Sequence, residues 1–153
     1  MNSHYETFKD RMPQLMPWTY AGATDAEKAK QTAWHARLRA ETNCELHETA
    51  FVSREAIILY DRLTLGEGSW IAANCLVRGK VEMGDHSTLN CGAITIGKVK
   101  IGNCVRVAAN AQFMGFNHGH ARTDIPIYRQ ECTEKGIVIE DDVWVGANCV
   151  ICD

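Results

Sequence analysis

A six-residue repeat of large apolar side chains runs through the second half of the chain. In steps of six from Leu65, eight of the nine positions up to Phe113 are large and apolar. These positions are Leu65, Ile71, Val77, Met83, Leu89, Thr95, Ile101, Val107 and Phe113. Two residues before them runs a series of small or branched side chains: Ser69, Cys75, Val81, Ser87, Ala93, Val99, Val105 and Ala111. The repeat returns at Ile139, Val145 and Ile151.

This period suits strands and not a helix. An α-helix turns by about 100° per residue, so a six-residue step scatters the apolar side chains over several faces. In a strand, positions i−2 and i share one face. Glycines follow directly after several of the large positions, where a tight corner is expected. They are Gly66, Gly84, Gly102 and Gly146. The pattern therefore predicts short strands and corners that stack into a parallel β-solenoid.

The first part of the chain, residues 1–45, follows a different pattern. Thr24 and Glu27 have the spacing of a capping box, and helix-forming residues follow them to about residue 43. We expect a helix there, with one apolar stripe along it. The stripe comprises Ala26, Ala29, Ala33, Trp34 and Leu38. The preceding "RMPQLMPWTY" contains two prolines, which predicts an irregular arm.

The repeat is interrupted between Phe113 and Ile137, and we place a loop insertion at residues 114–138. The segment is polar and carries two histidines, His118 and His120. Long irregular loops in compact folds are commonly functional. A histidine with a pKa of about 6.5 is both neutral and basic near pH 7, which suits proton transfer. Either histidine is therefore a candidate general base.

Composition excludes several classes of function. With 16 basic and 19 acidic residues, the net charge of −3 does not favour binding to nucleic acid or an anionic membrane. The N-terminus lacks the order of a secretory signal, so we expect a cytoplasmic location. The seven cysteines are then expected to be reduced, including Cys149, which the repeat places inward, and Cys152, which it places outward.

Units such as "IGNCVR", "VAANAQ" and "VGANCV" resemble the hexapeptide repeat of left-handed β-helix acyltransferases. Within that family, "VAANAQFMGFNHGH" followed by "GIVIEDDVWVGANCVI" resembles the galactoside, maltose and xenobiotic acetyltransferase branch. The resemblance covers about two thirds of the chain. It implies a left-handed parallel β-helix over residues 46–153. Because the chain stops within a repeat unit and related enzymes have further coils, we expect it to be C-terminally incomplete.

The resemblance also implies an activity and its residues. It implies transfer of an acetyl group from acetyl-CoA to a hydroxyl or amine of a small acceptor such as a sugar, within a homotrimer whose active sites lie between subunits. The family's catalytic histidine aligns with His118, which becomes the general base. His120 is the alternative base, or else binds the acceptor or structures the loop. No metal is expected.

Further site residues follow from the same alignment. Asn90 and Thr88 are candidates for acceptor binding, although an asparagine at a corner also satisfies its own backbone. Trp144 lies between two inward positions and is expected to point outward beside the acyl-CoA site or a neighbouring subunit. Ala147 matches a position whose backbone N–H binds the thioester oxygen in related enzymes. Alternatively, Ala147 is an ordinary small residue at a corner.

Two alternatives stay open at this point. The first is a metal-dependent hydratase of the γ-carbonic-anhydrase type, in which His86, His118 and His120 would supply three zinc ligands across an interface. The second is a non-catalytic β-helix scaffold.

Overall fold

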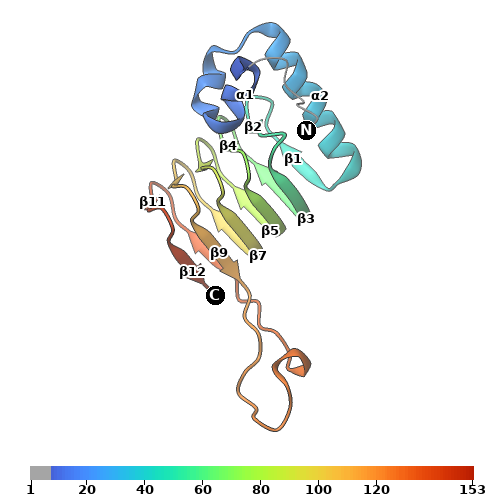
Figure 1. The fold of residues 1–153 in the computed structure, drawn as a ribbon, viewed down its shortest axis with the longest axis vertical. Helices are drawn as coiled ribbons and strands as arrows, with labels where there is room; N and C mark the ends of the chain where they lie inside the picture. The colour runs from blue at the N-terminus through green and yellow to red at the C-terminus, as the bar shows by residue number, and fades with distance from the viewer. Residues whose placement is uncertain (1–7) are drawn as a thin grey trace.

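The computed structural model describes residues 8–153, so the first seven residues of the expected segment 1–45 lie outside the described part. A stack of parallel coils carries helices at one end and a long loop at the other (Figure 1). Within residues 8–153, no helix combines the length and the apolar character needed to cross a membrane.

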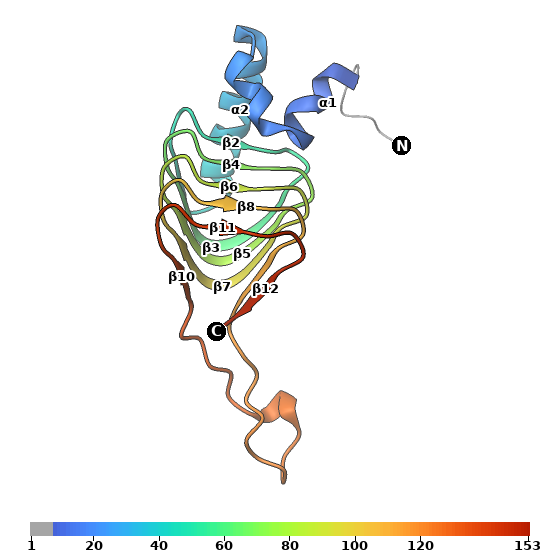
Figure 2. The same cartoon turned by 90° about the vertical axis from the view of Figure 1, so that its left-hand side faces the viewer.

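Each complete coil contributes one long bent strand and one short strand, and every ladder between coils is parallel. The long strands form a sheet of β1 (Cys44–Leu46), β3 (Ile57–Leu65), β5 (Leu76–Met83), β7 (Ile94–Ile101), β9 (Gln112–Gly115) and β12 (Val150–Cys152), in that order, with β10 (Ile137–Ile139) also paired to β7. The short strands form a second sheet of β2 (Phe51–Val52), β4 (Trp70–Ile71), β6 (Thr88–Leu89), β8 (Arg106–Val107) and β11 (Trp144–Val145). Figure 2 looks onto the stacked coils from the side.

The six-residue repeat fills the interior of this stack. All nine positions from Leu65 to Phe113, and all eight positions of the preceding series, are buried. Thr95 is the one polar residue among the nine, and its hydroxyl has no hydrogen-bond partner within the described chain. The predicted solenoid is therefore confirmed, with one imperfection in its core. After the loop the burial weakens, and Cys149, expected inward, is exposed because it lies in the last of the coils within residues 8–153.

The bends of each coil divide its outer surface into three faces. Face A is the outer side of residues 57–59, 76–78, 94–96, 112–114 and 150–152. Face B is the outer side of residues 62–65, 80–83, 98–101 and 137–139, and face C is the outer side of the short strands. Faces A and B belong to the same long strands, which bend at Gly79 and Gly97, both with positive φ.

The other two corners also use left-handed backbone. Four residues between faces B and C have φ near +60°, namely Gly68, His86, Cys104 and Asp142. Four between faces C and A do the same, namely Asn74, Gly92, Asn110 and Asn148. Glycine, asparagine, aspartate and histidine tolerate this conformation best. The predicted corner glycines lie two residues earlier in the sequence. At Gly66 there is no room for a side chain, because a Cβ would lie 2.4 Å from Asp85 Oδ1, and Gly84 and Gly102 are equally crowded. A Cβ on Gly146 would meet only Cys149 Sγ, at 3.5 Å.

The helices cover the first coil. The chain passes through α1 (Phe8–Leu15), a 3₁₀ helix η1 (Pro17–Gly22) and α2 (Asp25–Glu41) before it enters the coils. The irregular arm expected before residue 24 is therefore wrong, because Pro13 lies inside α1 and Pro17 begins η1, where the missing N–H costs little. The capping box of Thr24 and Glu27 is present as predicted.

The buried side of α2 differs from the expected alanine stripe. Ala26, Ala29 and Ala33 are exposed, whereas Gln31, His35 and Leu38 are buried. Gln31 Nε2 donates to the Val52 carbonyl (3.0 Å) and lies 3.0 Å from His35 Nε2. Gln31 is buried because its amide satisfies the Val52 carbonyl of the first coil, and His35 is buried against Gln31; α2 thereby covers this end of the stack.

Candidate functional site

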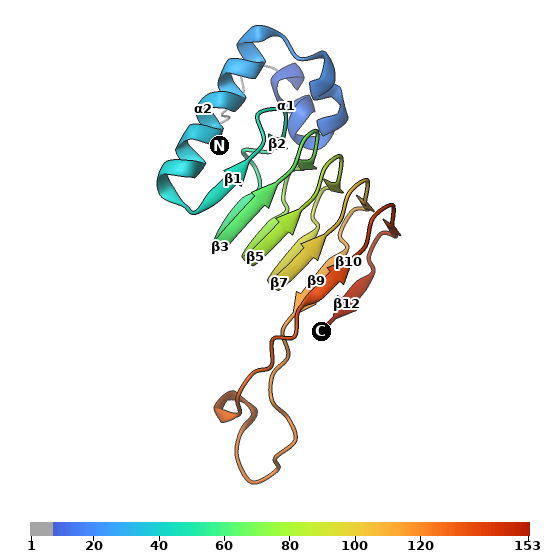
Figure 3. The same cartoon turned by 180° about the vertical axis from the view of Figure 1, so that it is seen from behind.

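The loop between β9 and β10 leaves the stack at the corner between faces A and B. β9 pairs with β7 up to Gly115 and Gly97, and β10 resumes the pairing at Ile137 and Val99. Residues 116–136 therefore occupy the place of the single residue Lys98 in the coil before. The loop extends well beyond the coils in all three views, as seen from behind in Figure 3.

The two arms of the loop are held together where they leave the coils. Asn117 and Thr133 exchange backbone hydrogen bonds of 2.8 Å in an antiparallel bridge. The Asn117 side chain donates to the carbonyl of Asp153 (2.7 Å), and the Asp153 carboxylate accepts from the backbone N–H groups of Lys135 and Gly136. These contacts fix the residue before the first histidine and the opposite arm of the loop.

His118 lies directly after this bridge and is exposed. Its Nδ1 is 3.4 Å from Cys132 Sγ on the opposite arm, and its ring lies edge-on to Phe116 with the ring centres 5.6 Å apart. Its Nε2 has no hydrogen-bond partner among residues 8–153. The imidazole is thus held on one side and open on the other, which a general base requires.

His120 is also exposed, and its Nδ1 lies 3.1 Å from the carbonyl oxygen of His118. A carbonyl only accepts, so this Nδ1 carries the proton and the Nε2 of neutral His120 is unprotonated. The geometry therefore leaves both histidines able to face a substrate.

The far end of the loop folds on itself. Arg122 forms an ion pair with Asp124, which holds the pKa of that carboxyl below its usual value. The Gln130 side chain accepts from the Arg122 N–H (3.1 Å) and donates to its carbonyl (2.8 Å). The short helix η2 (Ile127–Arg129) presents Ile127 and Tyr128 to solvent, and Tyr128 is 75% exposed. An exposed aromatic residue at a loop tip is a common contact for a partner or ligand.

The candidates for acyl-CoA binding lie elsewhere on the chain. Trp144 points outward from face C and is 78% exposed. Ala147 lies at the corner between faces C and A, is exposed, and has no acceptor for its N–H among residues 8–153. Neither residue shares the corner from which the histidine loop leaves the same chain.

The candidates for acceptor binding are less accessible. The Asn90 side chain is half-buried and accepts the N–H of Cys91 (2.8 Å), which is the corner role considered above. Thr88 lies between its ladder neighbours Trp70 and Arg106 and is only 2% exposed, so its hydroxyl does not reach the surface of the single chain. The structure thus does not bring either residue to the histidine loop.

No group of three or more histidine, cysteine, aspartate or glutamate side chains within residues 8–153 is arranged to hold a metal ion. His86 lies at the corner between faces B and C, whereas His118 and His120 lie on the loop, so the three do not meet within one chain. All seven cysteines are free. Burial raises the pKa of the Cys75 thiol to about 12, which makes this thiol unreactive.

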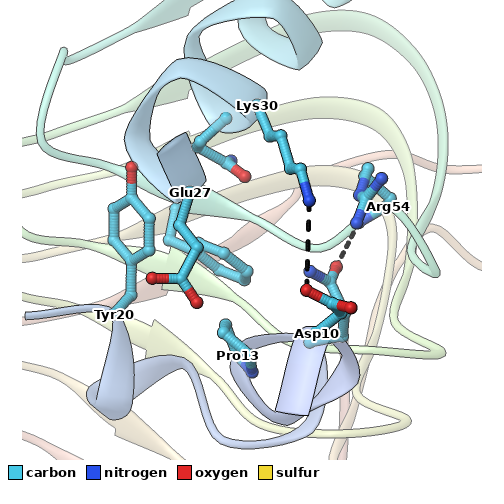
Figure 4. A pocket seen from close by; sticks show the side chains of 9 residues that line it. Asp10, Pro13, Tyr20, Glu27, Lys30 and Arg54 are labelled. Atoms are coloured by element: carbon cyan, nitrogen blue, oxygen red, sulfur yellow. Dashed lines mark hydrogen bonds and ion pairs between the residues drawn. The ribbon is translucent and has the colours of Figure 1, made fainter. Parts of the chain in front are cut away.

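A small pocket lies between the helices and the first coil (Figure 4). Its volume of about 30 Å³ is room for little more than one water. Its polar groups hold the fold together, because Lys30 lies 3.9 Å from Asp10 and the Glu27 carboxylate accepts from both the N–H and the hydroxyl of Thr24. Those bonds lower the pKa of Glu27. None of the residues predicted for the site lines this pocket.

Cys132 is the residue of the loop that sequence reasoning missed. It stands fourteen positions from His118, and only the antiparallel bridge of the two arms brings the pair together. Its sequence neighbours gave no signal, because irregular loops have no periodicity from which a contact follows.

Comparison with solved structures identifies the same architecture in a mutant of AntD, an N-acyltransferase from Bacillus cereus in complex with dTDP-4-amino-4,6-dideoxyglucose and coenzyme A. The TM-score is 0.63 at 15% sequence identity, over 77% of this chain and 68% of that chain. Neither protein-family models nor curated proteins gave a match. The similarity confirms the predicted left-handed parallel β-helix with an N-terminal helical segment.

Proposed function

We propose that this protein is an acyltransferase that moves an acetyl group from acetyl-CoA to a hydroxyl or amine of a small, sugar-like acceptor. The β-helix supports this proposal, because AntD has the same architecture and holds coenzyme A with an amino sugar nucleotide. The observation that carries it is the loop. A stack that repeats with little variation is interrupted once, and the interruption presents an exposed imidazole held at one nitrogen by Cys132.

In the proposed mechanism His118 takes the proton from the acceptor through Nε2 as the acceptor attacks the thioester carbon. A thioester is already activated, so positioning of both substrates and stabilisation of the oxyanion supply the remaining rate enhancement. The Ala147 N–H is the proposed oxyanion donor, with Trp144 beside the acyl donor. Cys132 positions the His118 ring, and His120 contacts the acceptor.

The proposed assembly is a homotrimer with its sites between chains. His118 and Ala147 lie at different corners of one chain, so a site that uses both draws on two chains. Face A offers a contact surface, because its outward side chains are largely apolar. Ile57 and Leu59 are 55% and 59% exposed, and Leu76, Ile94, Ile96 and Met114 continue the patch across three further strands. Exposed apolar patches of this kind mark protein interfaces. The cytoplasmic location expected from the N-terminus belongs to the same proposal.

The test is release of coenzyme A from acetyl-CoA against a panel of sugars, amino sugars and nucleotide sugars. His118→Ala is expected to lower kcat by about 10²–10⁴-fold, the usual contribution of a positioned base. His120→Ala is the matched control on the same loop and is expected to raise KM for the acceptor while kcat changes little. If His120→Ala abolishes turnover and His118→Ala does not, the two roles are exchanged. If both variants keep full activity, the loop is not the catalytic element.

A further inference from the structure

A groove of about 540 Å³ runs along face B beside the base of the histidine loop. It is lined by side chains of β3, β5 and β7 and by the end of the loop, where the chain returns into β10. Among the lining residues, five carry cationic side chains and two carry acidic ones. The cations are Arg62, Lys80, Lys98, Lys100 and Lys135, and the acids are Asp61 and Glu82.

Three of these cations form a column fixed by strand register. Arg62 pairs with Lys80, and Lys80 pairs with Lys98, on strands that lie about 4.8 Å apart. Like charges directly opposite one another on neighbouring strands destabilise a sheet. The strands cannot relieve this repulsion by sliding, since a slip of one residue would turn the buried side chains outward; the ladder shifts register only between Tyr60 and Arg62 of β3.

The protein itself neutralises little of this charge. Arg62 pairs with Glu45 at 3.3 Å, and Lys100 interacts with Asp141. Lys80, Lys98 and Lys135 make no ion pair within residues 8–153. The concentration of positive charge is also opposite in sign to the chain as a whole, whose net charge is −3. Glu82 lies opposite Lys100 in the ladder, so the unpaired cations nearest the loop are Lys80, Lys98 and Lys135, and they make this part of the groove attractive to an anionic ligand.

The column leads to the loop that carries the histidines. A Cβ on Gly136 would lie 3.1 Å from both Cβ and Cγ of Lys98, so the stem of Lys98 packs against the returning arm of the loop. Lys135 adjoins it on that arm. His118 follows the bridge between Asn117 and Thr133, three residues beyond Gly115 and hence roughly 10 Å along an extended chain. A group held by Lys98 and Lys135 is thus within the length of one substrate molecule from His118.

We propose that this groove binds the diphosphate group of a substrate and thereby orients the substrate toward the loop. Cations spaced along adjacent strands match the spread of negative charge over two linked phosphates. The orientation of the substrate toward the loop rests on the proposed acyl transfer. The binding of phosphate in the groove does not depend on that function. The same chemistry is present in two substrate classes, coenzyme A as donor and a nucleoside diphosphate sugar as acceptor.

The test measures binding to the whole chain by calorimetry with three probes: inorganic diphosphate, coenzyme A and dTDP. Lys80→Ala/Lys98→Ala is expected to weaken diphosphate binding by tenfold or more, and binding to the wild type is expected to fall with rising salt. The control is Lys9→Ala/Lys28→Ala, which removes two exposed lysines from the helices and is expected to change affinity less than twofold. Unaltered thermal unfolding and elution volume show that the variants keep the fold and assembly.

The other two probes identify the source of the phosphates. Weakened binding of coenzyme A alone assigns the groove to the donor, and weakened binding of dTDP alone assigns it to the acceptor. The proposal is overturned if the wild type binds none of the probes, or if Lys80→Ala/Lys98→Ala binds all of them as tightly as the wild type. Failure of the proposed function gives a different result. In that case the wild type shows no turnover with any acceptor, but Lys80→Ala/Lys98→Ala still loses diphosphate binding.

Discussion

The coils from residue 65 to 113 and the loop of residues 116–136 differ in what their side chains contact. In the coils, both inward series are buried at every position. In the loop, no side chain is buried, and the histidines, Arg122, Asp124 and Tyr128 all face solvent. The inward side chains of the coils therefore form the core, whereas the side chains of the loop are exposed and free to contact a ligand or partner. The difference predicts that substitutions in the two regions act on different measurements.

The largest expected effect on stability lies at the end of the repeat. Phe113 is fully buried, and Phe113→Ala is expected to lower the free energy of unfolding by about 3–5 kcal/mol, because it removes a large apolar side chain and leaves a cavity. Tyr128→Ala, at the exposed loop tip, is expected to change it by less than about 0.5 kcal/mol. Urea unfolding of both variants measures this. Equal losses would mean that the loop is part of the core, contrary to its exposure.

The histidines also differ in environment, because His35 is buried whereas His118 and His120 are exposed. The buried histidine makes stability depend on pH. Burial, and then the charge of Arg39, lower the pKa of His35 to about 4, and the Gln31 amide that donates to Val52 also faces its Nε2. As pH falls from about 6.5 to 4, the unfolded chain binds this proton before the folded chain does, so acid favours unfolding. The expected loss is about 3 kcal/mol at pH 4 relative to pH 7.

Urea unfolding at pH 7 and pH 4 checks this prediction. In His35→Gln that part of the pH dependence is expected to disappear, while acid effects from the carboxylates remain in both proteins. An identical pH dependence in the variant would mean that His35 binds its proton equally well in the folded protein and in the unfolded chain.

The corner from which the loop departs is expected to be sensitive as well. Gly97 has a φ of +83°, and an added Cβ would lie 2.9 Å from the carbonyl oxygen of Gly115. Gly97→Ala is therefore expected to lower the free energy of unfolding by about 2 kcal/mol through backbone strain and the clash. Gly22→Ala, where a Cβ would meet nothing within 4 Å, is the control and is expected to be nearly neutral. Thermal unfolding of the two variants compares them directly.

The smallest effect has the opposite sign and tests the core of the coils. Thr95 is fully buried and its hydroxyl lacks a partner within the described residues. Thr95→Val keeps the shape of the side chain and removes the orphaned hydroxyl, so stability is expected to rise by about 1 kcal/mol. Thr95→Ser retains the hydroxyl and is expected to be destabilising. A loss of stability in Thr95→Val would indicate an unrecognised hydrogen bond at this position.

The sequence predicted the coils better than it predicted the loop or the helices. A period of six recurs many times, so the inward positions could be read before any contact was known. The burial of Gln31 and His35 could not be read in this way, because Gln31 donates to the carbonyl of Val52, 21 residues away in sequence, and His35 contacts Gln31. The same holds for the contact of Cys132 with His118 and for the cation column, which needed the register of β3, β5 and β7.

The attachment of the loop has a consequence for how such a protein can change. Because residues 116–136 replace one residue of the ladder, and β9 and β10 both pair with β7, the coil after the loop keeps its alignment whatever the length between them. The insertion behaves as an exchangeable module on a fixed frame. The length and sequence of this module can therefore change without any repacking of the coils beneath it.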